Sequence, residues 1–469
     1  MDTKNDSHTA LGTHRHSRRE MLKHLIVAGV ALPSLSSLLS GCGSGGSPGA
    51  TNSGSAPGAQ AEVARPLTVT YYDWIINLHP AIEGEVNKDF ALTTPIKSQI
   101  APVQGFGIER FVAEARDKMS SWDVYVGMTP FIEMSSLVEA GVIEPWDNYI
   151  PKEVLDDIIP AIREEGSING KLYNWPFFVD VIVQGWHAGL VEKAGVDPEV
   201  APKTWDEYLA NARKVSQSKA APYGCTFDAH GWRSLAPIAH SISTEVYTPE
   251  GLFDFTNAAA VEALEIMRRM KEFANPNVLN PGAADAGIND TPDEGVFAAQ
   301  QAAYYIKYQN AHRRFAGTWP DPGKLRLAGL PKTAGGVGGS VFWTTGAALF
   351  TFGANKEQAG KYMRALTYDE RIWRHSIGKS REAVGHMPPY TSQWKQWSAK
   401  HPEWIDESTF LIQEKMASSR SIKANRFGVT QFNIGQPYWE KYLKGEEADS
   451  KKAMQQAKDA VMAEFKKAR

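Results

Sequence analysis

The sequence predicts an α/β protein, because predicted strands and helices alternate along the chain. Pro66–Tyr72 is rich in β-branched and aromatic residues, which is typical of a buried strand. Helices are expected at Glu83–Leu92, Ile108–Met119 and Ile132–Glu139, and a second strand at Trp122–Gly127. This alternation favours a parallel sheet with helices on its faces.

The same alternation continues in the second half of the chain. Thr204 and Glu207 have the spacing of a capping box, in which two side chains bond free backbone amides at a helix start. The expected helices are Thr204–Ser216, Ala258–Phe273, Glu294–Gln301, Lys356–Leu366 and Ser450–Lys467, and the expected strands are Val181–Trp186, Ala302–Tyr308 and Gly346–Phe352.

Length and charge limit the classes of function. The 469 residues include 50 Lys and Arg against 53 Asp and Glu, a net charge of −3. No overall positive field favours nucleic acid, so a nucleic-acid partner is not expected. A folded part of roughly 400 residues is too long for one hydrophobic core, so two domains are expected.

The first 41 residues have the features of an export signal. Arg18 and Arg19 precede an apolar run at 25–39, which is too short to span a bilayer of about 30 Å. The order resembles a twin-arginine (Tat) signal, although Sec export stays open. Leu39-Ser40-Gly41-Cys42 resembles a lipobox, in which cleavage before Cys42 leaves an N-terminal cysteine that receives lipid. The alternative is an ordinary secreted protein with an incidental cysteine.

Residues 1–41 are therefore expected to be a Tat-like lipoprotein signal peptide, and 42–65 a lipidated cysteine with a flexible linker. Gly43–Ala64 consists mainly of Gly, Ser, Ala, Pro, Thr and Asn, a composition that cannot bury a core. The protein is expected outside the cytoplasm, anchored by lipid at the outer side of the cytoplasmic membrane or in the periplasm. Cys225 then has no disulfide partner and is expected to be a buried apolar residue.

Several segments, in this order, resemble the extracellular solute-binding proteins of bacterial ABC importers, in particular the maltose- and oligosaccharide-binding group. They are Asn169–Pro176 (NGKLYNWP), Pro202–Tyr208 (PKTWDEY), Val296–Tyr304 (VFAAQQAAY), Asn355–Ala359 (NKEQA) and Leu443–Glu447 (LKGEE). Gln300 replaces a glycine that is usual in the third segment. The resemblance covers nearly the whole exported chain.

This resemblance implies a two-lobed fold of the periplasmic-binding-protein type (type II), with a ligand cleft between lobes joined by hinge strands. Lobe 1 is expected at 66–178 plus about 332–380, and lobe 2 at 179–331 plus about 381–469. The chain is expected to cross between the lobes near Phe178–Asp180, Leu330–Thr333 and His375–Val384. Closure of such lobes would desolvate a solute on both sides.

Aromatic faces stack on the C–H faces of sugars, and carboxylates and amides bind hydroxyl groups, so candidate contacts combine both kinds of side chain. Some follow predicted strands, where open α/β sheets bind ligands, and others have cleft positions implied by the resemblance. The candidates are Tyr72, Asp73, Trp74, Gly127, Met128, Asp180, Trp232, Arg233, Tyr308, Gln309, Trp343 and Phe432, with Thr129, Asn310 and Asn433 as adjoining candidates.

Each candidate has an alternative interpretation. Most aromatic residues pack in cores, and Met128 has the same alternative. Trp343 follows two glycines and is the favoured stacking platform, while Asp180 is either a ligand contact or a salt-bridged hinge carboxylate. Arg233 either binds a carboxylate-bearing sugar or pairs with an acid of the protein.

Catalytic motifs with fixed spacing are absent from the sequence, including H-E-x-x-H, G-x-S-x-G, the P-loop and C-x-x-C. We therefore expect no enzyme, no cofactor and no metal. The expected function is capture of a sugar or oligosaccharide by a monomer that delivers it to ABC permease subunits in the membrane. Alternatives are a secreted glycoside hydrolase, which needs two carboxylates, a sensor lipoprotein, and binding of a polyol, glycerol phosphate or polyamine.

Overall fold

The computed structural model describes residues 65–100, 108–279, 292–416, 419–425 and 427–467. The predicted signal peptide, Cys42 and the linker as far as residue 64 lie outside these ranges. Within them, no helix is both long and apolar enough to cross a membrane.

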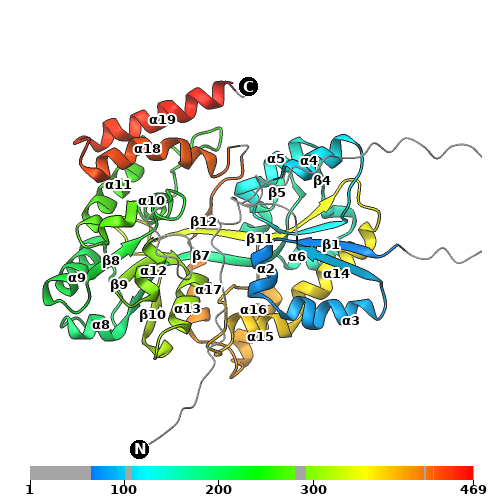
Figure 1. The fold of residues 1–469 in the computed structure, drawn as a ribbon, viewed down its shortest axis with the longest axis horizontal. Coiled ribbons are helices and arrows are strands. Elements are labelled where there is room, and N and C mark those ends of the chain that lie inside the picture. The colour runs from blue at the N-terminus through cyan, green and yellow to red at the C-terminus, as the bar shows by residue number, and fades with distance from the viewer. Residues whose placement is uncertain (1–64, 101–107, 280–291, 417–418, 426, 468–469) are drawn as a thin grey trace, which may run out of the picture. The chain divides into compact units, whose positions relative to one another are not determined.

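A mixed sheet runs through the fold in the order β2-β1-β3-β11-β7-β9-β8 (Figure 1). β1 pairs in parallel with β2 and β3, and β8 with β9, whereas β11 and β7 pair antiparallel with each other and with their outer neighbours. The strands are β1 Leu67–Tyr71, β2 Ile96–Ile100, β3 Val124–Met128, β4 Ile143–Glu144, β5 Ser167–Ile168, β6 Lys171–Leu172, β7 Trp175–His187, β8 Tyr223–Phe227, β9 Ala302–Tyr308, β10 Leu325–Ala328, β11 Val341–Phe350 and β12 Arg420–Ser421.

Two large hydrophobic clusters divide this fold into lobes, which Figure 1 shows on either side of β7 and β11. Helices of lobe 1 are α2 Asp73–Leu78, α3 Asn87–Ala91, α4 Glu109–Arg116, α5 Ser135–Glu139, α6 Lys152–Asp157, α7 Pro160–Glu165, α14 Lys356–Tyr368, α15 Glu370–Ile377, α16 Thr391–Lys400 and α17 Ser408–Met416. Helices of lobe 2 are α8 Ala188–Lys193, α9 Trp205–Ser218, α10 Leu235–Ile242, α11 Ala258–Lys271, α12 Pro292–Ala298, α13 Gln309–Gly317, α18 Thr430–Lys444 and α19 Ser450–Lys467. A smaller cluster joins α12, α13 and β9.

The elements expected from the sequence are present; β9 and α19 have the expected bounds, and the others have shifted ends. The helix expected at Glu83–Leu92 is divided into a π-helical turn, Ile82–Val86, and α3. The capping box is confirmed: the Thr204 hydroxyl accepts from the Glu207 amide at 3.1 Å, and the Glu207 carboxylate accepts from the Thr204 amide at 3.3 Å. Cys225 is buried, and its thiol donates to the Met270 carbonyl at 3.4 Å.

β7 makes the first crossing between the lobes. All 13 of its residues are buried, as expected for a strand covered on both faces. Its pairing partner changes from β11 to β9 between Val181 and Ile182, next to the expected Phe178–Asp180. Because β7 continues into both lobes, the strand expected at Val181–Trp186 begins earlier, at Trp175.

The other two crossings differ from the expectation. Val341 and Trp343 of β11 pack in the lobe 2 cluster and Phe342 in that of lobe 1, so this crossing lies there and not at Leu330–Thr333. The third lies at β12, which pairs with β11 between Met416 of lobe 1 and Ile422 of lobe 2, and not at His375–Val384.

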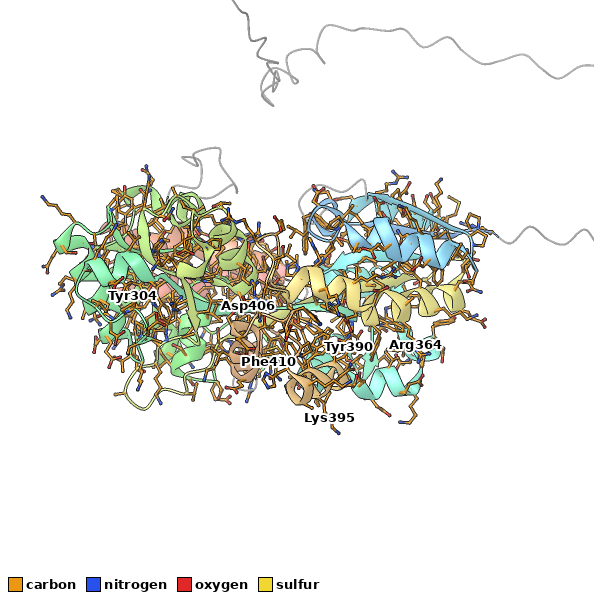
Figure 2. The ribbon with its side chains drawn as sticks, turned by 90° about the horizontal axis from the view of Figure 1, so that it is seen from below. Tyr304, Arg364, Tyr390, Lys395, Asp406 and Phe410 are labelled. Carbon is orange, nitrogen blue, oxygen red and sulfur yellow. The ribbon has the colours of Figure 1, made fainter. Side chains whose placement is uncertain are left out.

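Residues 387–416, which the sequence analysis assigned to lobe 2, contribute to the core of lobe 1. Met387, Tyr390, Trp394, Trp397 and Ile405 are all buried in the lobe 1 cluster. Figure 2 labels Tyr390, Lys395, Asp406 and Phe410 of this segment, with Tyr304 of β9 on the other lobe. Large aromatic side chains hold the segment on lobe 1 because their burial stabilises the fold.

Glu165 joins helix α7 to the crossing strand β11. Its carboxyl group accepts hydrogen bonds from the Thr344 amide, at 3.1 and 3.2 Å, and from the Thr344 hydroxyl, at 2.7 Å. Burial raises the pKa of Glu165 from its ordinary value of 4.5 to about 8, because desolvation outweighs these hydrogen bonds. The folded protein therefore holds this proton at neutral pH, whereas the unfolded chain releases it.

We expect Glu165→Gln to reduce the loss of stability as pH rises from about 5 to 8. Below about pH 4.5 the carboxyl group is protonated in both states. Above that pH, ionisation of the unfolded chain lowers the free energy of unfolding by up to about 1.4 kcal/mol per pH unit. Urea unfolding of both proteins at several pH values measures the free energies of unfolding. The free energy of unfolding of the variant, relative to that of the wild type, should increase as pH rises.

Glu164→Gln, at the exposed neighbouring position, is the matched control and should follow the wild type. If Glu165→Gln instead paralleled the wild type at every pH, the buried proton on Glu165 would be refuted.

Candidate functional site

A cavity of about 580 Å³ lies between the two lobes, and we call it the interlobe cavity. Its size is within the range of about 300 to 1,000 Å³ that is usual for small-molecule sites. It is lined by Tyr72, Trp74, Asn77, Leu78, Thr129, Ile132, Asp180, Trp232, Arg233, Tyr308, Asn310, Arg314, Trp343, Thr345 and His386.

The sheet explains why these residues meet. Tyr72 and Thr129 directly follow β1 and β3, and Trp232 lies in the loop after β8. Tyr308 is the last residue of β9. All four residues therefore lie at the carboxyl ends of parallel strands. The crossing strands β7 and β11 add side chains between them, among which Asp180 and Trp343 lie directly opposite each other in the register.

Seven predicted contacts line the interlobe cavity, and they come from both lobes and from the crossing strands. They are Tyr72, Trp74, Asp180, Trp232, Arg233, Tyr308 and Trp343.

Five predicted contacts do not line it. Asp73 is exposed at the start of α2, and its carboxylate accepts from the Trp74 amide at 2.7 Å. Met128 and Phe432 are fully buried in the cores of lobe 1 and lobe 2, so their side chains are packing residues. Gly127 and Gln309 do not line the cavity but contact residues or strands that do.

Gly127 and Gln309 support residues of the wall. A Cβ atom at Gly127 would lie 2.7 Å from the Cβ of Tyr72, and its φ of 142° is rare for other residues, so glycine lets Tyr72 approach β3. The buried side chain of Gln309 donates to the Val179 carbonyl at 2.9 Å and accepts from the Val181 amide at 2.6 Å. It thereby fixes β7 on both sides of Asp180.

Two adjoining candidates, Thr129 and Asn310, also line the cavity, whereas Asn433 does not. The sequence analysis did not select six residues of the wall: Asn77, Leu78, Ile132, Arg314, Thr345 and His386. Arg314 carried a usable signal, because it lies four residues after Asn310 on α13 and so shares its helix face. His386 had no such signal, since a loop of lobe 1 brings it to the cavity.

Aromatic side chains form much of the wall. The Trp343 ring packs edge-on against Trp232, with 5.4 Å between ring centroids, and against Tyr308, with 5.6 Å. Trp343 is 6% exposed and Trp232 is 7% exposed, so each offers only a small part of its surface. Trp74, of lobe 1, is less buried and packs edge-on against Phe178 at 5.6 Å. These faces can stack on an apolar face of a solute.

Asp180 provides a carboxyl group at the hinge. Asn310 donates a short hydrogen bond to its Oδ1 atom, and Gln309 donates another at 3.2 Å. Burial raises the pKa of Asp180 to about 7, although the Asn310 hydrogen bond and the charge of Arg314 lower it part of the way. Near neutral pH this group can therefore accept or donate a hydrogen bond to a solute hydroxyl.

Two histidines lie behind Asp180. His386 Nδ1 and His79 Nε2 share a hydrogen bond of 2.8 Å, and His386 Nε2 lies 3.7 Å from Asp180 Oδ2. The His386 ring also stacks on Phe178 with 3.9 Å between centroids. Burial lowers the pKa of His79 to about 3 and holds that of His386 well below its ordinary value. The histidine pair is therefore neutral and adds no charge to the cavity.

A buried group of charges fixes Arg233. Its guanidinium donates to Asp228 Oδ2 at 3.1 Å and lies 4.1 Å from the centre of the Trp232 ring. Asp228 also accepts a short hydrogen bond from Lys307, whose ammonium group lies 3.3 Å from Asp293 and 2.7 Å from Glu294. Arg233 thus pairs with an acid of the protein, one of the two alternatives left open by the sequence.

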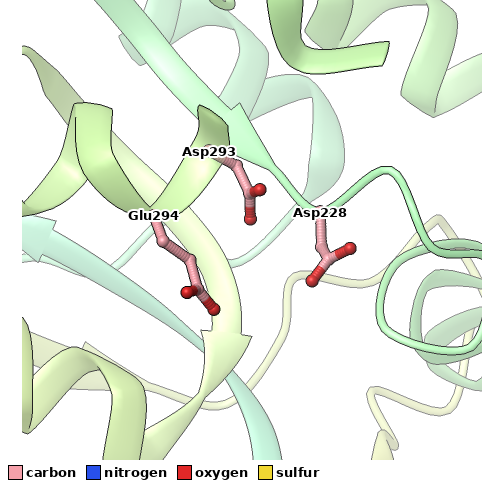
Figure 3. A group of neighbouring side chains, drawn as sticks. All are labelled: Asp228, Asp293 and Glu294. Carbon is pink, nitrogen blue, oxygen red and sulfur yellow. The ribbon is translucent and has the colours of Figure 1, made fainter. Parts of the chain in front are cut away.

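Figure 3 shows the carboxyl groups of Asp228, Asp293 and Glu294 pointing towards one another. Their oxygen atoms are close enough together to hold a metal ion. The Lys307 ammonium group, however, contacts all three carboxyl groups and so occupies the place of a cation. Lys307 and Arg233 hold the pKa of Asp228 well below its ordinary value, whereas burial raises that of Asp293.

Comparison with known proteins agrees with this geometry. A family model described as bacterial extracellular solute-binding protein matches residues 102–377. The chain belongs to this family. Members of the family bind solutes outside the cytoplasm, so the family is one of exported binding proteins.

Sequence relatives are distant. A probable ABC transporter-binding protein of Deinococcus radiodurans is 26% identical over 247 residues, which cover 49% of this chain and 56% of the relative. A mannitol-binding protein of Pseudomonas aeruginosa is 23% identical over 155 residues, covering 32% of this chain and 34% of the relative. The chain thus spans about half, or less, of the length of the curated relatives it matches.

Solved structures match the fold over most of the chain. A Thermotoga lettingae solute-binding protein with bound α-D-tagatose has a TM-score of 0.69 and 19% identity, covering 85% of this chain and 99% of that one. The maltose-bound MalE3 protein of T. maritima has a TM-score of 0.67 and 17% identity, with the same coverage. The predicted two-lobed fold is confirmed.

We expect Asp228→Asn to destabilise the protein by about 3–5 kcal/mol, because it leaves Lys307 and Arg233 buried with less negative charge. Asp293→Asn is the matched control and should lower the free energy of unfolding by less. Because the pKa of Asp293 is raised, this residue tends to be protonated, and a neutral Asn resembles the protonated acid. Urea unfolding at pH 7 compares the two variants. Equal losses, or a larger loss for Asp293→Asn, would contradict this division of charge.

Proposed function

We propose that the protein captures a sugar or oligosaccharide in the interlobe cavity and delivers it to the permease subunits of an ABC importer. The single observation that carries the proposal is the composition of the cavity wall. Aromatic rings of Trp74, Trp232 and Trp343 lie beside the hydrogen-bonding groups of Asp180 and Asn310 in one cavity between two lobes. Stacking and hydrogen bonding together are the interactions by which proteins hold sugars.

The solutes of similar proteins support a polyhydroxylated solute. An arabinooligosaccharide, tagatose and maltose are sugars, and mannitol is a sugar alcohol. Three crossing segments, β7, β11 and β12, connect the described lobes, an arrangement in which small changes at the hinge close a cleft around its solute. A solute-loaded closed form then differs in shape from the empty form, which a permease can recognise.

The wall disfavours two alternatives. A glycoside hydrolase needs two carboxyl groups about 5 to 9.5 Å apart, and among the described residues that line the cavity Asp180 is the only acid. A polyamine would need several acidic partners, whereas this wall carries two arginines. We therefore propose that the protein binds its solute without chemical change. From the signal and lipobox patterns of the sequence we also propose a monomer held at the membrane by lipid on Cys42.

Thermal unfolding of the purified protein with mono- and oligosaccharides, polyols, sugar acids, sugar phosphates and polyamines tests this function. A ligand at about 100 times its dissociation constant adds about 2.7 kcal/mol of stability, which raises the melting temperature visibly. A rise with one sugar class, and recovery of that sugar unchanged, would support the proposal. No rise with any sugar, or hydrolysis of the sugar that binds, would refute it.

We expect Trp343→Ala and Asp180→Asn each to weaken binding of that sugar by about 1 to 3 kcal/mol, through loss of stacking and of an acidic hydrogen-bonding group. Isothermal titration calorimetry measures both affinities. Asp73→Asn is the matched control for Asp180→Asn, because the exposed Asp73 does not line the cavity, and it should bind as the wild type does. Unchanged affinity in a folded Trp343→Ala or Asp180→Asn variant would remove that residue from the site.

A further inference from the structure

The two arginines of the interlobe cavity have different electrostatic partners. Arg233 forms an ion pair with Asp228 at 3.1 Å. Arg314, on α13, donates from Nε to the neutral Asn310 side chain at 3.3 Å, and forms no ion pair with any described residue. A guanidinium group has five N–H donors, so most donors of Arg314 have no protein partner in the described part of the chain.

The charge of Arg314 acts within the cavity. Burial raises the pKa values of Asp180 and Tyr308 and lowers that of His386, and the charge of Arg314 acts on all three pKa values in the downward direction. All three residues line the same wall. Both histidines behind Asp180 are neutral, so they add no further positive charge beside Arg314. The Asp180 carboxyl group is the one acid on the described wall, but its hydrogen bonds come from Asn310 and Gln309 and not from Arg314.

The charges behind Arg233 are balanced among themselves. Lys307 and Arg233 face Asp228 and Glu294, while burial favours the protonated form of Asp293. This group therefore leaves no net negative charge to neutralise Arg314. Closure around a neutral solute would remove water from Arg314, which is costly for a cation. The one acid of the described wall, Asp180, would balance this charge only in part, because burial keeps it partly protonated near neutral pH and its carboxyl group forms no ion pair with Arg314.

From this arrangement we infer that the solute carries an anionic group, a carboxylate or a phosphate, which pairs with Arg314 while its hydroxyl groups and rings meet the rest of the wall. The inference rests on the proposed function, since it defines the class of sugar that the same cavity takes: a sugar acid or a sugar phosphate. A guanidinium group suits both anions, because its planar fork can donate two parallel hydrogen bonds to two oxygens. The aromatic wall and Asp180 would then bind the sugar ring and its hydroxyl groups, and Arg314 would select solutes that carry an anionic group.

Matched sets of solutes test the inference on the full purified protein. Each set contains a neutral sugar, its acid and its phosphate: glucose, glucuronate and glucose 6-phosphate; galactose, galacturonate and galactose 6-phosphate. Maltose with maltobionate, and trigalacturonate with its neutral methyl ester, extend the sets to oligosaccharides. We expect an anionic member to bind at least tenfold more tightly than its neutral partner in calorimetry, with an affinity that falls as salt concentration rises. The acid and phosphate arms distinguish the two anions.

Arg314→Gln should weaken binding of the anionic solute tenfold to a hundredfold and should abolish most of its preference over the neutral partner. Arg314→Lys, which keeps the charge, should retain part of the preference. Arg313→Gln removes the same charge from the neighbouring position of α13, where the side chain lies 3.3 Å from Asp406 and donates to the Gly378 carbonyl at 2.7 Å. It does not line the cavity and should leave the preference unchanged.

Arg313 is largely buried, so Arg326→Gln, which breaks a surface ion pair with Glu199, provides a second charge-matched control. A neutral sugar that binds as tightly as its acid and phosphate would overturn the inference and leave the proposed function standing. The inference would also be overturned, with the proposed function left standing, if Arg314→Gln kept the full anion preference and had an unchanged melting temperature in the absence of solute. If no member of any set binds, both proposals fail.

Discussion

The antiparallel pairing of β7 with β11 is the interaction on which the rest of this structure depends. Trp175–Val181 pairs with Phe342–Ala347, and every residue of both strands is buried. The paired backbones satisfy their hydrogen bonds away from water, which buried strands require. Because each strand also packs in both hydrophobic clusters, the pair joins the lobes and carries Asp180 and Trp343 to the same cavity. Hinge and site are therefore one structural element.

The buried titratable groups around the β7–β11 pair differ in charge. Glu165 is uncharged where it bonds β11, and the His79–His386 pair is uncharged behind Asp180. Asp228, by contrast, stays ionised because Lys307 and Arg233 contact it directly. Arg233 is thereby part of the protein's own framework. Arg314 differs because no described acid pairs with it, and this difference makes it the residue of the wall most open to a charged solute.

Local sequence patterns predicted the α/β class and several elements, because such patterns depend on neighbours in the chain, but they missed others, among them β2, β8 and α13. The Thr204–Glu207 capping box is confirmed, and β9 has the expected bounds. Trp343 was selected from the glycines before it, and Asp180 from the hinge position that the family resemblance implies; both reach the cavity. Phe432 could not be separated from a core residue, because an aromatic side chain suits either environment until Phe253 and Phe255 are known to enclose it. His386 reaches the wall through a contact made far away in sequence.

By itself, the sequence determined the α/β class, the order of the elements and the family, because these follow from periodicity, capping and local motifs. Only the tertiary structure decided where the chain crosses between lobes, since that depends on which core buries the aromatic residues of 387–416. The tertiary structure also decided which arginine of the cavity has an acidic partner. The sequence contains Arg233 and Arg314 as equal cations, and only packing places Asp228 against the first and leaves the second without an ion pair in the described chain.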